Sequence, residues 1–307
     1  MKKAILSFIL LLSSFSFLRA QCIVDAGAAL SVACGGSVQL QAKMSAMKVS
    51  SPTTNDLYQV HFFDPETGYI AGANGTILRS TDGGISWNMT TFMPDQTWNS
   101  VNFASQLTGY IASFGGKIAK TTDGGLSWNV IYSDETRSFS KLKFISLTTG
   151  FAISFQGLIL RTTDGGASWN QVSSGTSAIL RDIVFVNGVK GFICGDYDYA
   201  LGANVFLTTT DSGASWSNSF VTTNLDNFYS IAFINENTGY VAGDDFPCKT
   251  TDGGISWSTT GWTRGFCLAL WDDTTGFVCN NFSVFKCTDN NSFPTYILDG
   301  SVYFEDI

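Results

Sequence analysis

An eight-residue motif recurs along this chain, and its spacing constrains the fold more than any other feature. Its common form is T-T-D-G-G-x-S-W, and successive motif aspartates are separated by 41, 41, 47 and 41 residues. A degenerate sixth copy around Asp289 follows 37 residues later. A repeat of roughly 40 to 45 residues is typical of one blade of a β-propeller. The aspartate and tryptophan pairs of the five intact motifs are Asp82 and Trp87, Asp123 and Trp128, Asp164 and Trp169, Asp211 and Trp216, and Asp252 and Trp257.

Two further markers keep the same order in every repeat. A glycine followed by Tyr or Phe precedes each motif aspartate by 13 to 20 residues, and a short apolar run such as Val101-Asn102-Phe103 precedes each of these glycines. Apolar residues alternate with a period of two, and no helical stripe of useful length is present. Each repeat therefore predicts four short strands, with the apolar run as the first and the Gly-aromatic marker in the second.

Partial repeats at both ends predict how the array closes. Residues 26–50 match the second, third and fourth strands of a repeat that has lost its motif, whereas residues 301–306 match a first strand. Pairing these segments would close a ring and remove exposed sheet edges. We expect an all-β fold, a seven-bladed β-propeller of four-stranded antiparallel blades, as a single domain over residues 21–307. One of the blades would be the composite of the two chain ends.

The first twenty residues have the pattern of a secretory signal peptide. Lys2 and Lys3 precede an apolar run, and small residues follow where a signal peptidase cuts. We therefore expect residues 1–20 to be removed and the protein to be exported, to the periplasm or outside the cell. No later apolar run approaches the roughly 20 residues that a membrane helix needs, so no membrane span is predicted. The seven cysteines permit disulfides after export, and Cys194 is the natural odd one.

Composition excludes several classes of partner. The net charge is -8, which argues against nucleic acid as a ligand because phosphates require a basic surface. The single histidine, His61, lies in a strand pattern and is expected to be structural, and no cysteine spacing matches a zinc site. No cofactor and no metal are predicted, and we expect a monomer.

The recurring motif is expected to build turns. Its glycines permit positive φ in a tight hairpin, its aspartate can accept hydrogen bonds from turn amides, and its tryptophan can anchor the last strand by packing. Copies one blade apart point outward from the ring and cannot converge on one substrate. The motif aspartates are therefore predicted to be structural.

The motif resembles the Asp-box, or BNR, repeat of sialidases, sortilin-type receptors, xyloglucan hydrolases and the photosystem II assembly and stability factor family. The longer pattern, with Gly-[Tyr/Phe] before the box and Lys or Arg just ahead of it, most resembles the last family, over roughly residues 26–306. This resemblance implies a propeller strongly and a function weakly, because the motif belongs to the scaffold. It favours a non-catalytic binding role in assembly or stability of an envelope complex.

Sequence variation points to one face for a ligand. The fourth repeat has 20 residues between its marker glycine and its box aspartate, against 14 in the first three, and such insertions often mark a binding face. A protein segment or a glycan could bind there, and solvated acids or packed aromatics are the plainer alternatives. The candidate ligand-binding residues are Asp196, Tyr197, Asp198, Tyr199, Asp244, Asp245, Arg137, Arg181, Arg264, Trp98, Phe139 and Phe228.

A glycan-active hydrolase, sialidase-like or xyloglucanase-like, is the alternative function. Arg137, Arg181 and Arg264 would suffice in number for the arginine clamp that a sialidase resemblance implies. However, only Glu135 of the four glutamates after the signal peptide is expected on the ligand face. A xyloglucanase resemblance implies two propellers, and this chain has one. Binding without catalysis is the preferred interpretation.

Overall fold

The computed structural model describes residues 51–218, 227–244 and 247–260, residues 262 and 265, and six further strands between residues 21 and 298. All regular secondary structure in these residues is β, in six four-stranded sheets and one two-stranded sheet. Within the described part of the chain, no helix has the length and apolar character needed to cross a membrane.

Each four-stranded sheet takes its strands in chain order, and the sheets are called blades 1 to 6. Blade 1 contains β3 (Leu57–Phe62), β4 (Gly68–Gly72), β5 (Thr76–Ser80) and β6 (Asn88–Thr91). Blade 2 contains β7 (Trp98–Phe103), β8 (Gly109–Ser113), β9 (Lys117–Thr121) and β10 (Asn129–Ser133). Blade 3 contains β11 (Phe139–Phe144), β12 (Gly150–Ser154), β13 (Ile159–Thr162) and β14 (Asn170–Val172).

The remaining blades follow the same order. Blade 4 contains β15 (Leu180–Phe185), β16 (Gly191–Asp198), β17 (Ala203–Thr209) and β18 (Ser217–Asn218). Blade 5 contains β19 (Phe228–Phe233), β20 (Gly239–Gly243), β21 (Cys248–Thr250) and β22 (Ser258–Thr259). Blade 6 contains β23 (Cys267–Leu270), β24 (Thr275–Cys279), β25 (Val284–Thr288) and β26 (Asn291–Leu298).

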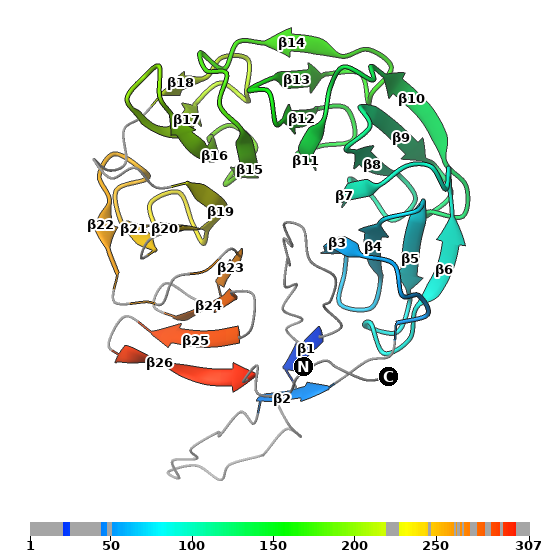
Figure 1. Cartoon of the computed structure of the whole chain (residues 1–307), viewed down its shortest axis with the longest axis horizontal. Helices are drawn as coiled ribbons and strands as arrows, with labels where there is room; N and C mark the ends of the chain where they lie inside the picture. Colours follow the sequence, from blue (N-terminus) through cyan, green and yellow to red (C-terminus); the bar gives the residue numbers. More distant parts are fainter. Residues whose placement is uncertain are drawn as a thin grey trace, which may run out of the picture.

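Figure 1 shows the six blades arranged around a common axis, with the first strand of each blade innermost. The predicted four-stranded antiparallel blades are therefore confirmed. Strand β1 (Gln21–Val24) pairs with β2 (Met44–Met47), and β2 contacts β26. The proposed closing strand at 301–306, most of residues 26–50 and the signal peptide lie outside the described residues. A seventh blade closed by the chain ends thus remains a prediction.

Aromatic side chains from neighbouring blades pack together at each interface. Tyr69 of blade 1 stacks on Phe103 of blade 2 with ring centroids 3.7 Å apart, and Trp128 meets Phe103 edge-on at 6.1 Å. The Tyr69 hydroxyl also donates to the Gly124 carbonyl in the box of blade 2, at 3.0 Å. Each sequence marker therefore supplies one member of an interface. The same groupings recur as Tyr110, Phe144 and Trp169, as Phe151, Phe185 and Trp216, and as Phe192, Phe233 and Trp257.

The glycine of the Gly-aromatic marker is required by close packing. A Cβ added to Gly109 would lie 2.5 Å from the ring of Phe103, which covers this position from the neighbouring strand. Gly150 has the same relation to Phe144, also at 2.5 Å. Because real Cβ atoms do not approach so closely, any side chain here would displace the ring from the blade interface.

The box forms a closed hydrogen-bonded turn, as the sequence predicted. In blade 2, Gly124 and Gly125 have φ of 72° and 84°. Asp123 accepts hydrogen bonds from the Leu126 and Ser127 amides at 3.0 and 2.9 Å, and from the Ser127 hydroxyl at 2.5 Å. The Ser127 hydroxyl and then its amide lower the pKa of Asp123 to about 2. Equivalent contacts hold Asp82, Asp164, Asp211 and Asp252, each with a pKa of about 2.

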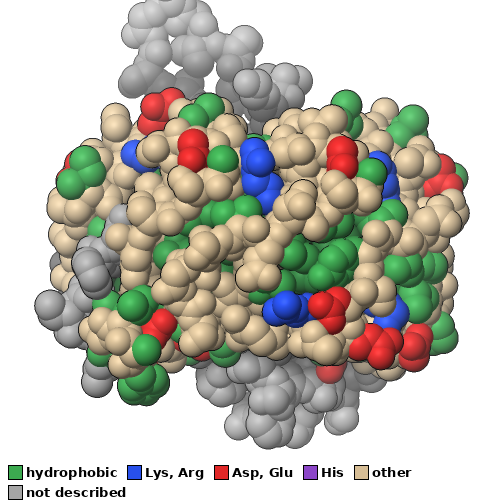
Figure 2. Space-filling model, turned by 90° about the horizontal axis from the view of Figure 1, so that it is seen from above, with side chains coloured by type: hydrophobic (Ala, Val, Ile, Leu, Met, Phe, Trp, Pro, Cys, Tyr) green, Lys and Arg blue, Asp and Glu red, His purple; other side chains and the backbone are tan. Residues whose placement is uncertain are grey.

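The outer rim of the blades carries few charged side chains in the view of Figure 2, in agreement with the low proportion of charged residues in the sequence. Figure 2 shows Lys, Arg, Asp and Glu side chains scattered over this view of the rim among uncharged polar surface and apolar side chains, with no extended basic area. Only 14% of residues are charged. Cys194 is buried and unpaired, whereas Cys267 is disulfide-bonded and lies opposite Cys279 in the register of β23 and β24.

Candidate binding site at the mouth of the ring

An extra residue interrupts the pairing of the two inner strands at the same place in blades 1 to 5. A β-bulge of this kind changes the direction of a side chain, and here it recurs at the start of each innermost strand. We call this end of the ring the mouth, and we include in it the fifth residue after each marker glycine. The bulge residues are Tyr58, Asn99, Ser140, Arg181 and Tyr229. The residues five after the marker glycines of blades 2 to 5 are Phe114, Phe155, Asp196 and Asp244.

Aromatic rings and one guanidinium group form a continuous series across the mouth. Tyr58 meets Phe114 edge-on with centroids 5.3 Å apart, and Phe114 lies 5.6 Å from Phe155. The guanidinium carbon of Arg181 lies 5.8 Å from the Phe155 ring centroid and 5.2 Å from that of Tyr229. Such cation–π contacts are favourable when partly desolvated. The series thus gives the mouth one aromatic side, in blades 1 to 3, and one charged side, in blades 4 and 5.

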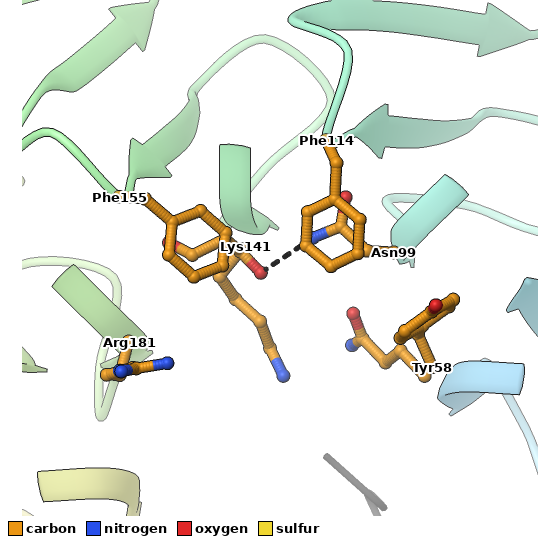
Figure 3. A pocket seen from close by; sticks show the side chains of 8 residues that line it. Tyr58, Asn99, Phe114, Lys141, Phe155 and Arg181 are labelled. Carbon is orange, nitrogen blue, oxygen red and sulfur yellow. Dashed lines mark hydrogen bonds between the residues drawn. The ribbon is translucent and has the colours of Figure 1, made fainter. Parts of the chain in front are cut away.

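A small pocket of about 20 Å³ lies beside this series. Figure 3 shows side chains from four blades turned toward it, with Lys141 and Arg181 extending inward and Phe114 and Phe155 beside them. The pocket is lined by Tyr58, Gln59, Asn99, Phe114, Ser140, Lys141, Phe155 and Arg181.

The charged groups of the mouth are held by internal contacts. Arg181 donates to both carboxylate oxygens of Asp196, from Nε at 2.7 Å and from Nη2 at 2.8 Å. The Tyr229 hydroxyl donates to Asp244 at 2.8 Å, and burial, then Asp244, raises the pKa of Tyr229 to about 12. These contacts orient the side chains in advance of any ligand. They also occupy both carboxylates, whereas glycoside hydrolysis needs a pair of carboxyl groups free to act on the bond.

The deeper charge pair joins blades 3 and 4. Lys141 lies 3.7 Å from Asp182, and both side chains are buried. Asp182 accepts hydrogen bonds from the Ile183 amide at 2.9 Å and from the Ile231 amide of blade 5 at 3.1 Å. The pair therefore links three consecutive blades under the pocket.

Among the residues that the structure describes, no three His, Cys, Asp or Glu side chains are grouped closely enough to hold a metal ion. His61 stacks on Phe103 with centroids 6.4 Å apart, and burial lowers its pKa to about 4. It is therefore neutral at pH 7.

The inserted segment of blade 4 is an extension of the hairpin between β16 and β17. Asp198 is buried and accepts hydrogen bonds from the Thr176 hydroxyl and from two amides of its own turn. Its role is to cap the turn. Tyr197 and Tyr199 meet edge-on at 5.1 Å, and Tyr199 is 89% exposed at the tip. Of the four predicted residues, Asp196 belongs to the mouth and the two tyrosines present surface beside it.

The remaining predicted ligand-binding residues are buried, are paired within their own turn, or lie outside the described residues. Trp98, Phe139 and Phe228 are buried, so the structure favours packing as their role. Trp98, for example, stacks on Phe92 and donates its indole N–H to the Phe92 carbonyl at 2.8 Å. Arg137 pairs with Asp134 at 3.3 Å in its own turn. Asp245 and Arg264 lie outside the described residues.

Sequence reasoning missed most of the pocket. Tyr58, Gln59, Asn99, Phe114, Ser140, Lys141 and Phe155 were not among the candidates, although Arg181 was. A signal was present in the repeat alignment. In blades 1 to 5 the positions equivalent to Arg181 hold Tyr, Asn, Ser, Arg and Tyr, and those equivalent to Asp196 hold Ala, Phe, Phe, Asp and Asp, whereas the residue before the first position is always large and apolar and the residue before the second is always Gly or Ser. Variation at two positions of an otherwise regular scaffold would have indicated the mouth.

Comparisons with known proteins agree with the fold. The family model described as "Photosynthesis system II assembly factor YCF48" matches residues 38–135 and 167–264. A solved structure of "YCF48 bound to D1 peptide" matches with a TM-score of 0.67 at 20% identity, covering 82% of this chain and 85% of that one. YCF48 from Cyanidioschyzon merolae matches with a TM-score of 0.51 at 15% identity, covering 78% and 95%.

An enzyme structure shares the fold as well. The GH74 enzyme from Niastella koreensis matches with a TM-score of 0.65 at 14% identity, covering 76% of this chain but 45% of the enzyme. At these identities the structural matches establish a propeller fold and no activity. No curated protein sequence matches this chain.

Proposed function

Since the chain belongs to the Photosynthesis system II assembly factor YCF48 family, we propose that it is a non-catalytic binding protein that holds a segment of a partner protein at the mouth. In this proposal the protein is exported and assists assembly or stability of a complex in the cell envelope. The related protein bound to a D1 peptide supports a peptide as the class of ligand. The D1 peptide itself is not proposed as the partner of this chain, because that relative is 20% identical to it.

The observation that carries the proposal is the aligned set of side chains at the mouth. Tyr58, Phe114 and Phe155 supply a partly buried aromatic surface, and Arg181 continues it. Aromatic and arginine side chains are enriched among the residues that dominate protein recognition, because aromatic rings bury large area with few rotatable bonds and the guanidinium group stacks on rings and forms several hydrogen bonds. Internal contacts fix these groups, so little conformational entropy remains to be lost on binding.

A catalytic role has less support. The described carboxylates at and under the pocket, Asp182, Asp196 and Asp244, all accept hydrogen bonds from the protein itself. A hydrolase would need one of them as an acid and another as a base or nucleophile. Binding requires no such freedom.

Site-specific photo-cross-linking tests the proposal. A photoreactive amino acid at Phe155 should capture a partner in intact host cells, and sequencing of the cross-linked peptide should identify one protein segment. The matched control is the same amino acid at Leu126, which is 71% exposed in a box at the opposite ends of the strands. Capture of the same partners from both positions, or of none from Phe155, would refute binding at the mouth. Capture of a glycan would replace the protein segment as the ligand.

A further inference from the structure

Two hydrogen-bond donors in the pocket have no acceptor among the described residues. Gln59 accepts from the Ser100 hydroxyl at 2.8 Å and from the Val101 amide at 3.2 Å, so its oxygen is committed and its amide nitrogen remains unused. Lys141 is 7% exposed, and its ammonium group lies 3.7 Å from Asp182, beyond hydrogen-bonding distance. Neither nitrogen is sealed from solvent, so a ligand in the pocket can accept from both, and shielding by the ligand strengthens such charge-assisted bonds.

Arg181 adds a third donor at the edge of the same pocket. Its Nε and Nη2 atoms donate to Asp196, which leaves Nη1 as the donor that a ligand can reach. Lys143 lies two residues after Lys141 on the same strand; burial lowers its pKa, the charge of Asp182 opposes this shift, and the charge of Lys141 adds to it. The carboxylate of Asp182 faces both ammonium groups and lies 3.7 Å from that of Lys141, but it is already bound to backbone amides and offsets two cations with a single charge.

The donors sit beside the aromatic side of the mouth. Phe114, Phe155 and Tyr58 line the same pocket as Gln59, Lys141 and Arg181. Its volume of about 20 Å³ suits a small polar group, with the rest of the ligand lying across the rings. A carboxylate matches this set of donors best because it offers acceptors only.

We propose that the pocket binds a carboxylate of the partner segment through Lys141, Gln59 and Arg181, with an adjacent apolar group against Phe114, Phe155 and Tyr58. This inference rests on the proposed function and specifies the chemistry of its site. The ligand is a peptide in which a negative charge and an apolar side chain are neighbours. The carboxylate is either that of an acidic side chain or that of a chain end.

Two small probes of equal shape test the charge requirement. By ligand-observed NMR, 3-phenylpropanoate should bind the full chain at least tenfold more tightly than 3-phenylpropanamide. The Gln59→Glu variant retains an oxygen for Ser100 and Val101 but replaces the free donor by a negative charge, so it should fold normally and abolish this preference. Lys141→Met should also abolish the preference. Lys117→Gln is the matched control, because Lys117 pairs with Glu135 and does not line the pocket.

The outcomes separate the inference from the proposed function. Equal binding of the two probes to the wild type, or an unchanged preference in folded Gln59→Glu, would overturn the carboxylate site. Displacement of the acid by equimolar inorganic phosphate would also overturn it, in favour of a general anion site. If Phe155 still cross-links the partner in Gln59→Glu as in the wild type, the proposed function stands without this inference. If the wild type captures no partner at Phe155, the proposed function falls.

The cross-linked segment distinguishes the two sources of the carboxylate. A synthetic peptide of that segment should lose at least tenfold in affinity either when its C-terminus is amidated or when its acidic residue is changed to the amide. Loss from the first change assigns a chain end, and loss from the second assigns a side chain. Loss from neither change overturns the inference.

Discussion

The box aspartate should stabilise the fold through its own turn. Asp123→Ala removes the acceptor for the Leu126 and Ser127 amides and for the Thr121 and Ser127 hydroxyls. A hydrogen bond to a charged group contributes about 1.5–3 kcal/mol when it is well shielded. The turn is open to water, which can replace part of each bond, so the expected loss is about 1–3 kcal/mol for the whole set.

Urea denaturation followed by tryptophan fluorescence measures this loss. Asp95→Ala is the control, because Asp95 is exposed and accepts one side-chain hydrogen bond, from Gln96. It should change the free energy of unfolding by less than about 0.5 kcal/mol. Binding of the partner at the mouth should be unaffected in folded Asp123→Ala. Loss of binding without loss of stability would refute a purely structural role.

The pH dependence tests the origin of the effect. The folded pKa of Asp123, about 2, lies below its ordinary value of 3.8 because Ser127 and Thr121 donate to the charged form. The charge therefore stabilises the fold fully above about pH 4, and this contribution is lost as the pH falls toward 2. The difference in stability between the wild type and Asp123→Asn should shrink over that interval. An equal difference at pH 7 and at pH 2.5 would contradict the electrostatic explanation.

Four further substitutions test other parts of the structure. Gly109→Ala should destabilise by about 1–3 kcal/mol, since its Cβ would lie 2.5 Å from the Phe103 ring, and a wild-type urea midpoint would contradict the packing argument. Asp182→Ala should lower the free energy of unfolding by about 3–5 kcal/mol, because it leaves Lys141 buried without its partner. A loss below about 1 kcal/mol in urea or thermal unfolding would contradict this, since it would show that water replaces the lost partner. Tyr199→Ser at the exposed hairpin tip should leave the free energy of unfolding unchanged. Asp198→Ala should lower it by about 1–3 kcal/mol, because it removes the acceptor for two amides of the turn. Similar melting temperatures for the two variants would refute the role of Asp198 as a turn cap.

The sequence alone determined the blade architecture, because each of its markers acts within or between adjacent repeats. The box residues bond to one another within one turn, and the marker glycine is covered by the phenylalanine of its own blade. Local contacts of this kind leave a local pattern, and its regular spacing produces a series of similar sheets around a common axis (Figure 1). Family membership followed from the same residues, since the scaffold motif is what the family shares.

Which side chains come together at the mouth depends on the tertiary structure. Tyr58, Phe114, Lys141 and Arg181 come from four blades, so the repeat alignment can mark each position as variable but does not show which side chains meet in one pocket. The bulge explains why the predicted aromatic residues at the strand starts are buried. Trp98 was predicted at the ligand face, but the extra residue Asn99 interrupts the two-residue alternation, so that Trp98 packs in the core and Asn99 lines the pocket. A β-bulge changes which of two neighbours faces the axis, and that change depends on pairing with another strand.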